Sequence, residues 1–233
     1  PGEKDMHVPA GGLAPEEYWQ HFYWDRENCF AARDIRITVP QKALYRDILF
    51  NVTREGVLEW QLHTSDDPLH LPMLVELRVP DTIPAELHEK VVVMRMQDSA
   101  RDPHRQAADP RLWRSVGGVC TDSLVTFTTS SFGRFRIDVD TIPPVVTASF
   151  SRGTDLRGRK SLYFTIKDEC SGIREYKVTM DGKWILGVHD PKRSRVTCKL
   201  DPERITRGTK HQVLLQVTDQ KKNITDYQTE FLW

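Results

Sequence analysis

The chain has 233 residues, of which 39% are hydrophobic and 28% charged, and its 33 basic residues balance its 33 acidic residues. This length suffices for two globular domains, each with a core of its own. No apolar run approaches the roughly 18 residues that a membrane span needs, so we expect no membrane span. Because the chain begins with Pro1 and its first residues do not resemble a signal peptide, we expect a fragment of a longer protein with any targeting information upstream.

The charges are distributed unevenly along the chain. Residues 1–140 contain 16 Lys and Arg against 22 Asp and Glu, whereas residues 141–233 contain 17 against 11. The simpler interpretation is that two solvated surfaces happen to differ. The alternatives are attraction between the domains, or a basic second domain that faces an anionic polymer. Basic clusters with interleaved aromatics are absent from the sequence, so we expect no nucleic-acid partner.

The sequence predicts an all-β protein with two tandem β-sandwich domains. Residues 1–17, rich in proline and glycine, are predicted to be a poorly ordered lead-in to a sandwich over residues 18–140. Residues 141–144 form a short linker that ends in two prolines, which cannot donate to a sheet ladder. Residues 145–233 form the second sandwich.

The first domain is predicted from short alternating segments. The aromatic cluster at residues 18–24 fits either one face of a short helix or an edge strand that ends in a turn at residues 25–28. Further strands are predicted at residues 35–39, 48–53, 57–63, 73–79, 91–97, 112–116, 123–129 and 133–139. Strands at this spacing, without helical periods between them, are typical of a sandwich.

The second domain shows the same pattern more clearly. Strands are predicted at residues 145–150, 161–167, 174–180, 183–188, 195–200, 211–218 and 225–232. Asp181-Gly182 predicts a type I′ hairpin, because both residues tolerate the positive φ that this turn requires. Seven strands over this length predict an immunoglobulin-like sandwich.

The four cysteines divide evenly between the domains: Cys29 and Cys120 in the first, Cys170 and Cys198 in the second. An even number in each domain is typical of an extracytoplasmic protein with one disulfide in each. Cys198 also alternates with apolar residues, which equally fits a buried thiol. No Cys-x-x-Cys spacing indicates a redox or zinc site.

Two acidic loops follow strands of the second domain, one containing Asp168 and the other Asp219 and Asn223. In a seven-stranded Greek key these loops fall at the end that faces the linker, so we expect them, with Asp140, to form loops between the domains. Their carboxylates would suit calcium. We favour the interpretation that the Asp and Asn side chains bind their own loop backbone, and we predict no metal.

Catalytic motifs are sparse. His21-x-x-x-Asp25 provides half of a zinc-ligand set, but neither His-x-His nor His-Glu-x-x-His occurs anywhere in the chain. Nucleophile elbows, phosphate loops and dinucleotide fingerprints are also absent. The sequence therefore predicts no catalytic residues and no cofactor.

Several motifs carry a resemblance to a known family. Asp-Thr-Ile-Pro-Pro at residues 140–144, Phe-Thr-Ile-Lys-Asp at 164–168 and Asp-Gly-Lys-Trp-Ile-Leu at 181–186 resemble the C-terminal region of secreted lysostaphin-type (LytM-like) zinc metallopeptidases of Gram-negative bacteria. Ile-Thr-Val-Pro at 37–40 and Ser-Val-Gly-Gly at 115–118 resemble the β-domain that precedes this region. That domain is in turn distantly similar to the β-module of ankyrins and netrin receptors.

The resemblance implies a function without catalysis in this chain. These enzymes hold zinc with His-x-x-x-Asp and His-x-His and hydrolyse peptidoglycan cross-bridges. The one matching motif falls in the β-domain, so we carry no catalytic role over to His21 or Asp25. The resemblance implies a non-catalytic accessory region that positions or stabilises the hydrolase outside the cytoplasm, in the periplasm, at the outer membrane or secreted. The implied partners are the enzyme's own N-terminal catalytic domain, peptidoglycan and cell-envelope proteins.

An alternative is an independent module of the cell envelope that binds a glycan or a protein. Such a module would use exposed aromatic side chains, for which Trp60, Trp113 and Trp184 are the candidates.

Overall fold

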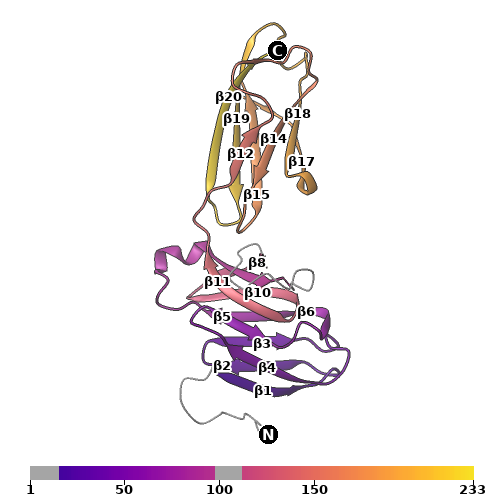
Figure 1. Cartoon of the computed structure of the whole chain (residues 1–233), viewed down its shortest axis with the longest axis vertical. Coiled ribbons are helices and arrows are strands. Elements are labelled where there is room, and N and C mark those ends of the chain that lie inside the picture. The colour runs from indigo at the N-terminus through magenta and orange to yellow at the C-terminus, as the bar shows by residue number, and fades with distance from the viewer. Residues whose placement is uncertain (1–15, 98–111) are drawn as a thin grey trace. The chain divides into compact units, whose positions relative to one another are not determined.

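The computed structural model describes residues 16–97 and 112–233. The chain divides into two compact units, of which the first ends at Asp140 and the second begins at Thr141. Both consist almost entirely of antiparallel β-sheets, so the all-β fold class predicted from the sequence is confirmed (Figure 1). Among the described residues, short 3-10 turns occur at η1 (Ala85–Lys90) and η3 (Pro191–Arg193). Within the described ranges, no helix is long and apolar enough to cross a membrane.

The first unit contains two sheets with a shared core. The strands are β1 (Glu17–Phe22), β2 (Asn28–Ala32), β3 (Ile35–Val39), β4 (Ile48–Arg54), β5 (Glu59–Leu62), β6 (Pro68–Arg78), β7 (Val91–Met96), β8 (Trp113–Gly117), β9 (Val119–Thr121), β10 (Leu124–Ser131) and β11 (Gly133–Val139). The sheets have the orders β1-β4-β5-β11-β7-β8 and β2-β3-β6-β10-β9. Apolar side chains of both sheets form one buried cluster, as in a sandwich.

The aromatic cluster near the start of the first unit is a strand, so the helical alternative is wrong. Strand β1 pairs with β4 along its whole length, from Glu17 opposite Thr53 to Phe22 opposite Ile48. Phe22 is fully buried and stacks on Phe50, with ring centroids 4.3 Å apart. Pairing with β4 and burial of this ring determine the extended conformation.

Strand β2 was not predicted, because its first residue was assigned to a turn. The Asn28 side chain closes the β1–β2 connection: its amide nitrogen donates to the backbone oxygen of Tyr23, and its oxygen accepts from the Tyr23 backbone N–H, each at 2.7 Å. The same residue then begins the ladder with β3, opposite Val39. Asn28, whose residue type is typical of turns, is thus also the first residue of a strand.

The short strand β9 was likewise not predicted from the sequence.

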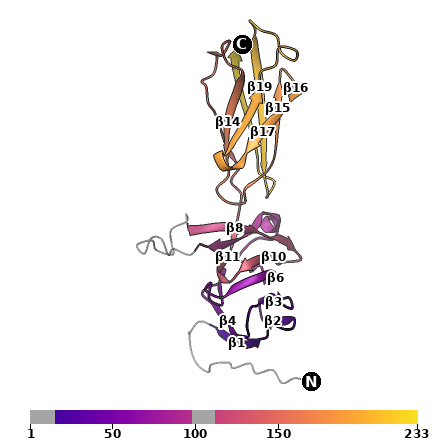
Figure 2. The same cartoon turned by 90° about the vertical axis from the view of Figure 1, so that its right-hand side faces the viewer.

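The second unit is an immunoglobulin-like sandwich. Its strands are β12 (Val145–Ala148), β13 (Thr154–Asp155), β14 (Ser161–Lys167), β15 (Ile173–Met180), β16 (Lys183–Ile185), β17 (Gly187–Asp190), β18 (Arg195–Lys199), β19 (Lys210–Asp219) and β20 (Ile224–Leu232). The order β12-β14-β18-β17 corresponds to the A-B-E-D sheet of immunoglobulin domains, and the order β13-β20-β19-β15-β16 contains the G-F-C strands. Figure 2 shows these sheets as two layers, with β14 in one and β15, β16 and β19 in the other.

One predicted strand, residues 183–188, is in fact two strands in different sheets. Ile185 of β16 pairs with Val178 in the five-stranded sheet, whereas Gly187 of β17 pairs with Cys198 in the four-stranded sheet. A β-carbon at position 187 would lie 2.8 Å from the Val196 Cγ1 atom, so the chain crosses between the sheets at a residue without a side chain.

The hairpin predicted at Asp181-Gly182 is confirmed. Both residues have positive φ, 48° and 76°, as a type I′ turn requires, and they join Met180 to its partner Lys183. The open space around Gly182 shows that its role is conformational rather than steric.

A buried histidine fastens this hairpin to the neighbouring strand. The His211 Nδ1 atom lies 2.6 Å from the Asp181 Oδ2 atom, and its Nε2 atom lies 2.8 Å from the backbone oxygen of Thr206. The Gln212 backbone N–H donates to Asp181 Oδ1 at 2.9 Å. Burial alone would raise the pKa of Asp181, but the hydrogen bonds from His211 and Gln212 outweigh it and hold this pKa below its usual range.

The last residue of the chain packs into the core of the second unit. The Trp233 side chain is 1% exposed, and its indole N–H donates to the backbone oxygen of Arg159 at 2.9 Å. The Arg207 guanidinium lies 4.8 Å from the indole ring centroid. The backbone oxygen of Trp233 accepts hydrogen bonds from the N–H groups of Gly208 and Thr209.

We predict that Gly182→Val lowers the free energy of unfolding by about 1 to 3 kcal/mol, because a β-branched residue at φ 76° is strained. Urea unfolding of the whole chain measures the change. Gly182→Asn is the matched control, because asparagine tolerates positive φ, and it should cost clearly less. Equal stability of wild type and the valine variant would refute the assigned turn.

We predict that Asp181→Asn costs about 1 kcal/mol near neutral pH, because it removes the charge from the hydrogen bond to His211. The pKa of Asp181 is lowered in the folded state, so its contribution is present above the unfolded value of about 3.9 and lost as the pH falls through the folded value. Urea unfolding at about pH 6 and about pH 2.5 should therefore show a difference from wild type that shrinks in acid. A constant difference at both pH values would contradict this.

Candidate functional site

Of the three tryptophans predicted to face a ligand, only one is exposed. Trp60 is 1% exposed, because it lies opposite Phe135 on the inner face of its sheet. Trp113 is 3% exposed and is covered by the Arg136 guanidinium, 4.3 Å from its ring centroid. The prediction is therefore wrong for these two residues. Trp184 is 56% exposed and lies opposite Thr179 on β15.

The disulfide interpretation of the cysteines is also wrong, and the free-thiol alternative holds: the four cysteines all lie in the described ranges and form no bridge. Cys29 and Cys120 belong to β2 and β9, the two outer strands of one five-stranded sheet. Four strand spacings separate them by about 19 Å, far beyond the roughly 7 Å between α-carbons that a disulfide spans. Cys198 lies opposite the start of β14, whereas Cys170 follows the far end of that strand.

Cys198 is the least reactive of the four by environment. Its side chain is fully buried in the second core, and burial raises the pKa of its thiol to about 11. Cys29, in contrast, is exposed on an edge strand.

In the two acidic loops of the second unit, an aspartate side chain accepts hydrogen bonds from backbone N–H groups of the same loop. The Asp168 Oδ1 atom accepts from the backbone N–H groups of Cys170 and Gly172, at 3.1 and 2.6 Å. The Asp219 Oδ1 atom accepts from the backbone N–H groups of Lys221 and Asn223, both at 2.8 Å. Asp168 and Asp219 thus bind their own loop backbone, the role that we favoured from the sequence over calcium binding.

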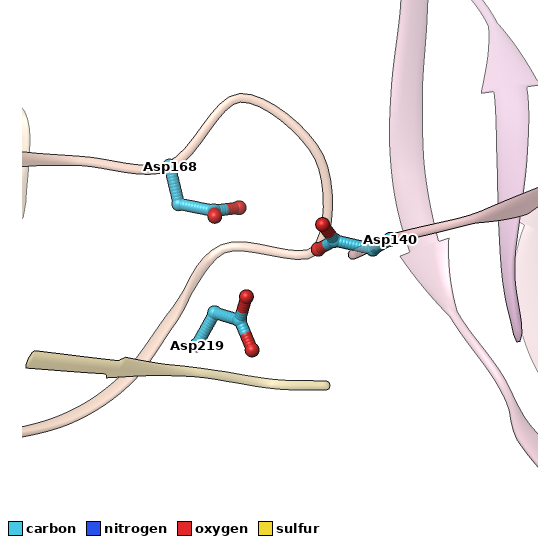
Figure 3. A group of neighbouring side chains, drawn as sticks. All are labelled: Asp140, Asp168 and Asp219. Atoms are coloured by element: carbon cyan, nitrogen blue, oxygen red, sulfur yellow. The ribbon is translucent and has the colours of Figure 1, made fainter. Parts of the chain in front are cut away.

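Figure 3 shows the side chains of Asp168, which follows β14, and of Asp219, the last residue of β19, and an oxygen atom of each lies within 4.8 Å of the other. The Asn223 amide donates to Asp219 Oδ2 at 2.7 Å. Calcium takes six to eight oxygen ligands, more than this pair of carboxylates supplies. Asp140, also drawn in Figure 3, ends the first unit, where its backbone N–H donates to the Lys90 oxygen at 2.9 Å. A grouping of these loops between the domains stays a prediction.

The half zinc motif is split between strand and turn. His21 is exposed on β1, and the Asp25 carboxylate pairs with Arg26 at 3.0 Å. The hydrogen bond from Arg26 holds the pKa of Asp25 below its usual range. In the described part of the chain, no cluster of three potential metal ligands contains a histidine or a cysteine.

A second buried histidine, His63, contacts two polar side chains of the first unit and was not singled out from the sequence. His63 has φ 53° and is 9% exposed. Its Nδ1 atom lies 2.9 Å from Asn51 Oδ1, and its Nε2 atom lies 2.8 Å from Asp67 Oδ2. Arg46 pairs with Asp67 at 2.7 Å and, with His63, holds the pKa of Asp67 below its usual range. Since both ring nitrogens are engaged, His63 has a structural role.

The candidate functional site is an apolar groove of about 560 Å³ in the second unit, beside the crossing between the sheets. We call it the edge groove. Its lining comprises the buried residues Met180, Ile185 and Ile205, the exposed residues Leu186 and Val188, and the polar residues Ser161, Thr197, Lys199, Asp201 and Arg204. Its volume lies within the range of about 300 to 1,000 Å³ that is usual for ligand sites.

Two apolar side chains of the edge groove are exposed to solvent rather than packed in the core. Leu186 is 62% exposed and Val188 is 60% exposed, and the two are separated only by the crossing residue Gly187. Exposed apolar groups that adjoin a cavity are typical of binding surfaces. The arrangement can hold an apolar group against Ile185 and Met180 without any change in the fold.

The charged residues of the edge groove leave it positive. Lys199 and Arg204 are exposed, and neither forms an ion pair with a described residue. Asp201 instead caps its own turn: its Oδ1 atom accepts from the Glu203 N–H at 3.0 Å, and its backbone oxygen accepts from Ile205.

Sequence reasoning missed this groove, although one local signal was present. Residues 184–188 read Trp-Ile-Leu-Gly-Val, four apolar side chains in five positions. A strand with one buried face alternates, so a run of this kind indicates that some apolar residues remain outside. The cations come from β18 and the following loop, which no local pattern could connect to this run.

The chain has an all-β fold with two sandwich units, and the edge groove lies in the second. A comparison with protein-family models matches residues 19–140 to the Zu5-like domain, more than half of the chain. The chain therefore belongs to the Zu5-like domain family. The sequence matches none of the curated proteins with which it was compared.

We predict that alkylation with iodoacetamide at about pH 8 modifies Cys29 first and Cys198 last. With a pKa of about 11, the Cys198 thiolate fraction is about one in a thousand at that pH. Mass spectrometry of the intact chain and of its peptides measures the order. An unreduced sample that resists alkylation at Cys29 and Cys120 would contradict the free-thiol assignment.

Proposed function

We propose that the chain is a non-catalytic accessory region of an extracytoplasmic metallopeptidase directed at peptidoglycan, and that it positions or stabilises the hydrolase by binding. The observation that carries the proposal is the Zu5-like match over residues 19–140. It covers the stretch whose motifs resemble the β-domain of lysostaphin-type enzymes.

The second unit supports the same proposal from its surface chemistry. Residues 141–233 carry 17 basic against 11 acidic residues, which favours an anionic polymer such as peptidoglycan with its stem-peptide carboxylates. Trp184, 56% exposed, offers an aromatic face of the kind that stacks on sugar rings.

A second function is an independent protein-binding module of the cell envelope. The edge groove favours it, because exposed apolar side chains beside a cavity suit a peptide better than a glycan.

Sedimentation with purified Gram-negative sacculi tests the first proposal. We expect the chain to pellet with the sacculi without reducing their turbidity, in the presence or absence of added zinc. Trp184→Ala should weaken the retention about threefold to tenfold, as expected for loss of one aromatic stacking contact.

Val119→Ala is the control, because Val119 is apolar, 69% exposed and in the first unit. It should leave the retention unchanged. Clearing of the sacculi would overturn the non-catalytic assignment, and failure to pellet would overturn peptidoglycan binding in favour of the second function.

A further inference from the structure

We propose that the edge groove binds an extended peptide segment of a protein partner, in which a bulky apolar side chain lies next to an acidic one. This inference rests on the binding role proposed above and names the partner class of one site. It follows from the strand edges, the apolar lining and the unpaired cations of the groove.

The strand edges supply the backbone partner. Strands β16 and β17 are the outermost strands of their sheets, and both contribute residues to the groove. An outer strand presents N–H and C=O groups to which an extended peptide can add. Lipids and sugars do not use such a ladder, so the geometry favours a peptide.

The apolar lining supplies the anchor. Leu186 and Val188 are the exposed apolar residues of the lining, while Ile185 and Met180 are buried, only 7% and 1% exposed. A leucine or phenylalanine side chain entering there would cover the two exposed residues. Burial of such an anchor is the usual source of affinity at a small interface.

The charges select the neighbouring residue. Lys199 and Arg204 have no ionic partner among the described residues, and Asp201 is occupied by its own turn. Asp201 keeps its negative charge while it accepts the hydrogen bond of that turn, so a carboxylate beside the apolar anchor would meet two cations and one anion, which leaves the groove net positive. A basic peptide would meet repulsion instead.

The test is selection of random nine-residue peptides displayed on phage against the whole chain. We expect enrichment of sequences in which Asp or Glu lies within two positions of Leu, Ile or Phe. Synthetic peptides of the enriched sequence are then titrated by fluorescence anisotropy. Replacing their acidic residues by lysine should weaken binding at least about tenfold.

Three variants locate the site. Leu186→Asn removes an anchor contact and Arg204→Glu reverses a cation, and each should weaken binding at least about fivefold. Ile224→Asn is the control, because Ile224 is 53% exposed on β20 and does not line the groove. It should change the affinity less than about twofold.

Several results would overturn the proposal. The first is a consensus of basic rather than acidic residues among the selected peptides. The second is enrichment of the same peptides against the Leu186→Asn variant, and the third is peptide binding that neither Leu186→Asn nor Arg204→Glu weakens. Sedimentation velocity that shows a dimer dissociated by Leu186→Asn would assign the groove to a second copy of the chain. Saturable binding of decanoate there, without peptide enrichment, would assign it to an amphiphile. Retention on sacculi through Trp184 should survive both groove variants, so the two proposals fail independently.

Discussion

The close contact between the Gly187 backbone and the Val196 side chain is the constraint on which the edge of the second unit depends. Because any side chain at position 187 would collide with Val196, only glycine lets the chain leave the five-stranded sheet and join the four-stranded one at this point. The Tyr176 hydroxyl donates to the Gly187 oxygen at 3.0 Å and holds the crossing in place. Leu186, at the crossing itself, then has no position inside the core, and the apolar groove opens beside it.

Local patterns predicted most of the fold because both units obey the alternation of a half-buried strand. In β3, Ile35, Ile37 and Val39 are buried on one face, as their spacing indicates. Strand β2 escaped prediction because its start depends on the Asn28 side chain binding Tyr23, a contact that composition does not reveal. The division of residues 183–188 into two strands escaped it because both halves have strand propensity.

The site was less predictable, since it depends on which face of each strand points inward and on which strands are neighbours. Trp60 alternates with polar residues and shares a strand face with Leu62, so the period of two already indicated burial, which the prediction of a ligand-facing Trp60 overlooked. An even cysteine count says nothing about whether Cys29 and Cys120 lie on adjacent strands. The roles of Asp168 and Asp219 were predictable, because their hydrogen bonds stay within four residues.

The buried Trp233 has a mechanical consequence. Strand β20 is antiparallel to β19 over nine register pairs, and Trp233, directly after β20, is held in the core by its indole ring and its backbone oxygen. A pulling force applied at this end along β20 would therefore load the whole ladder in shear, with its hydrogen bonds sharing the load rather than breaking one after another. Resistance to such a force therefore depends on the whole β19–β20 ladder rather than on any single hydrogen bond.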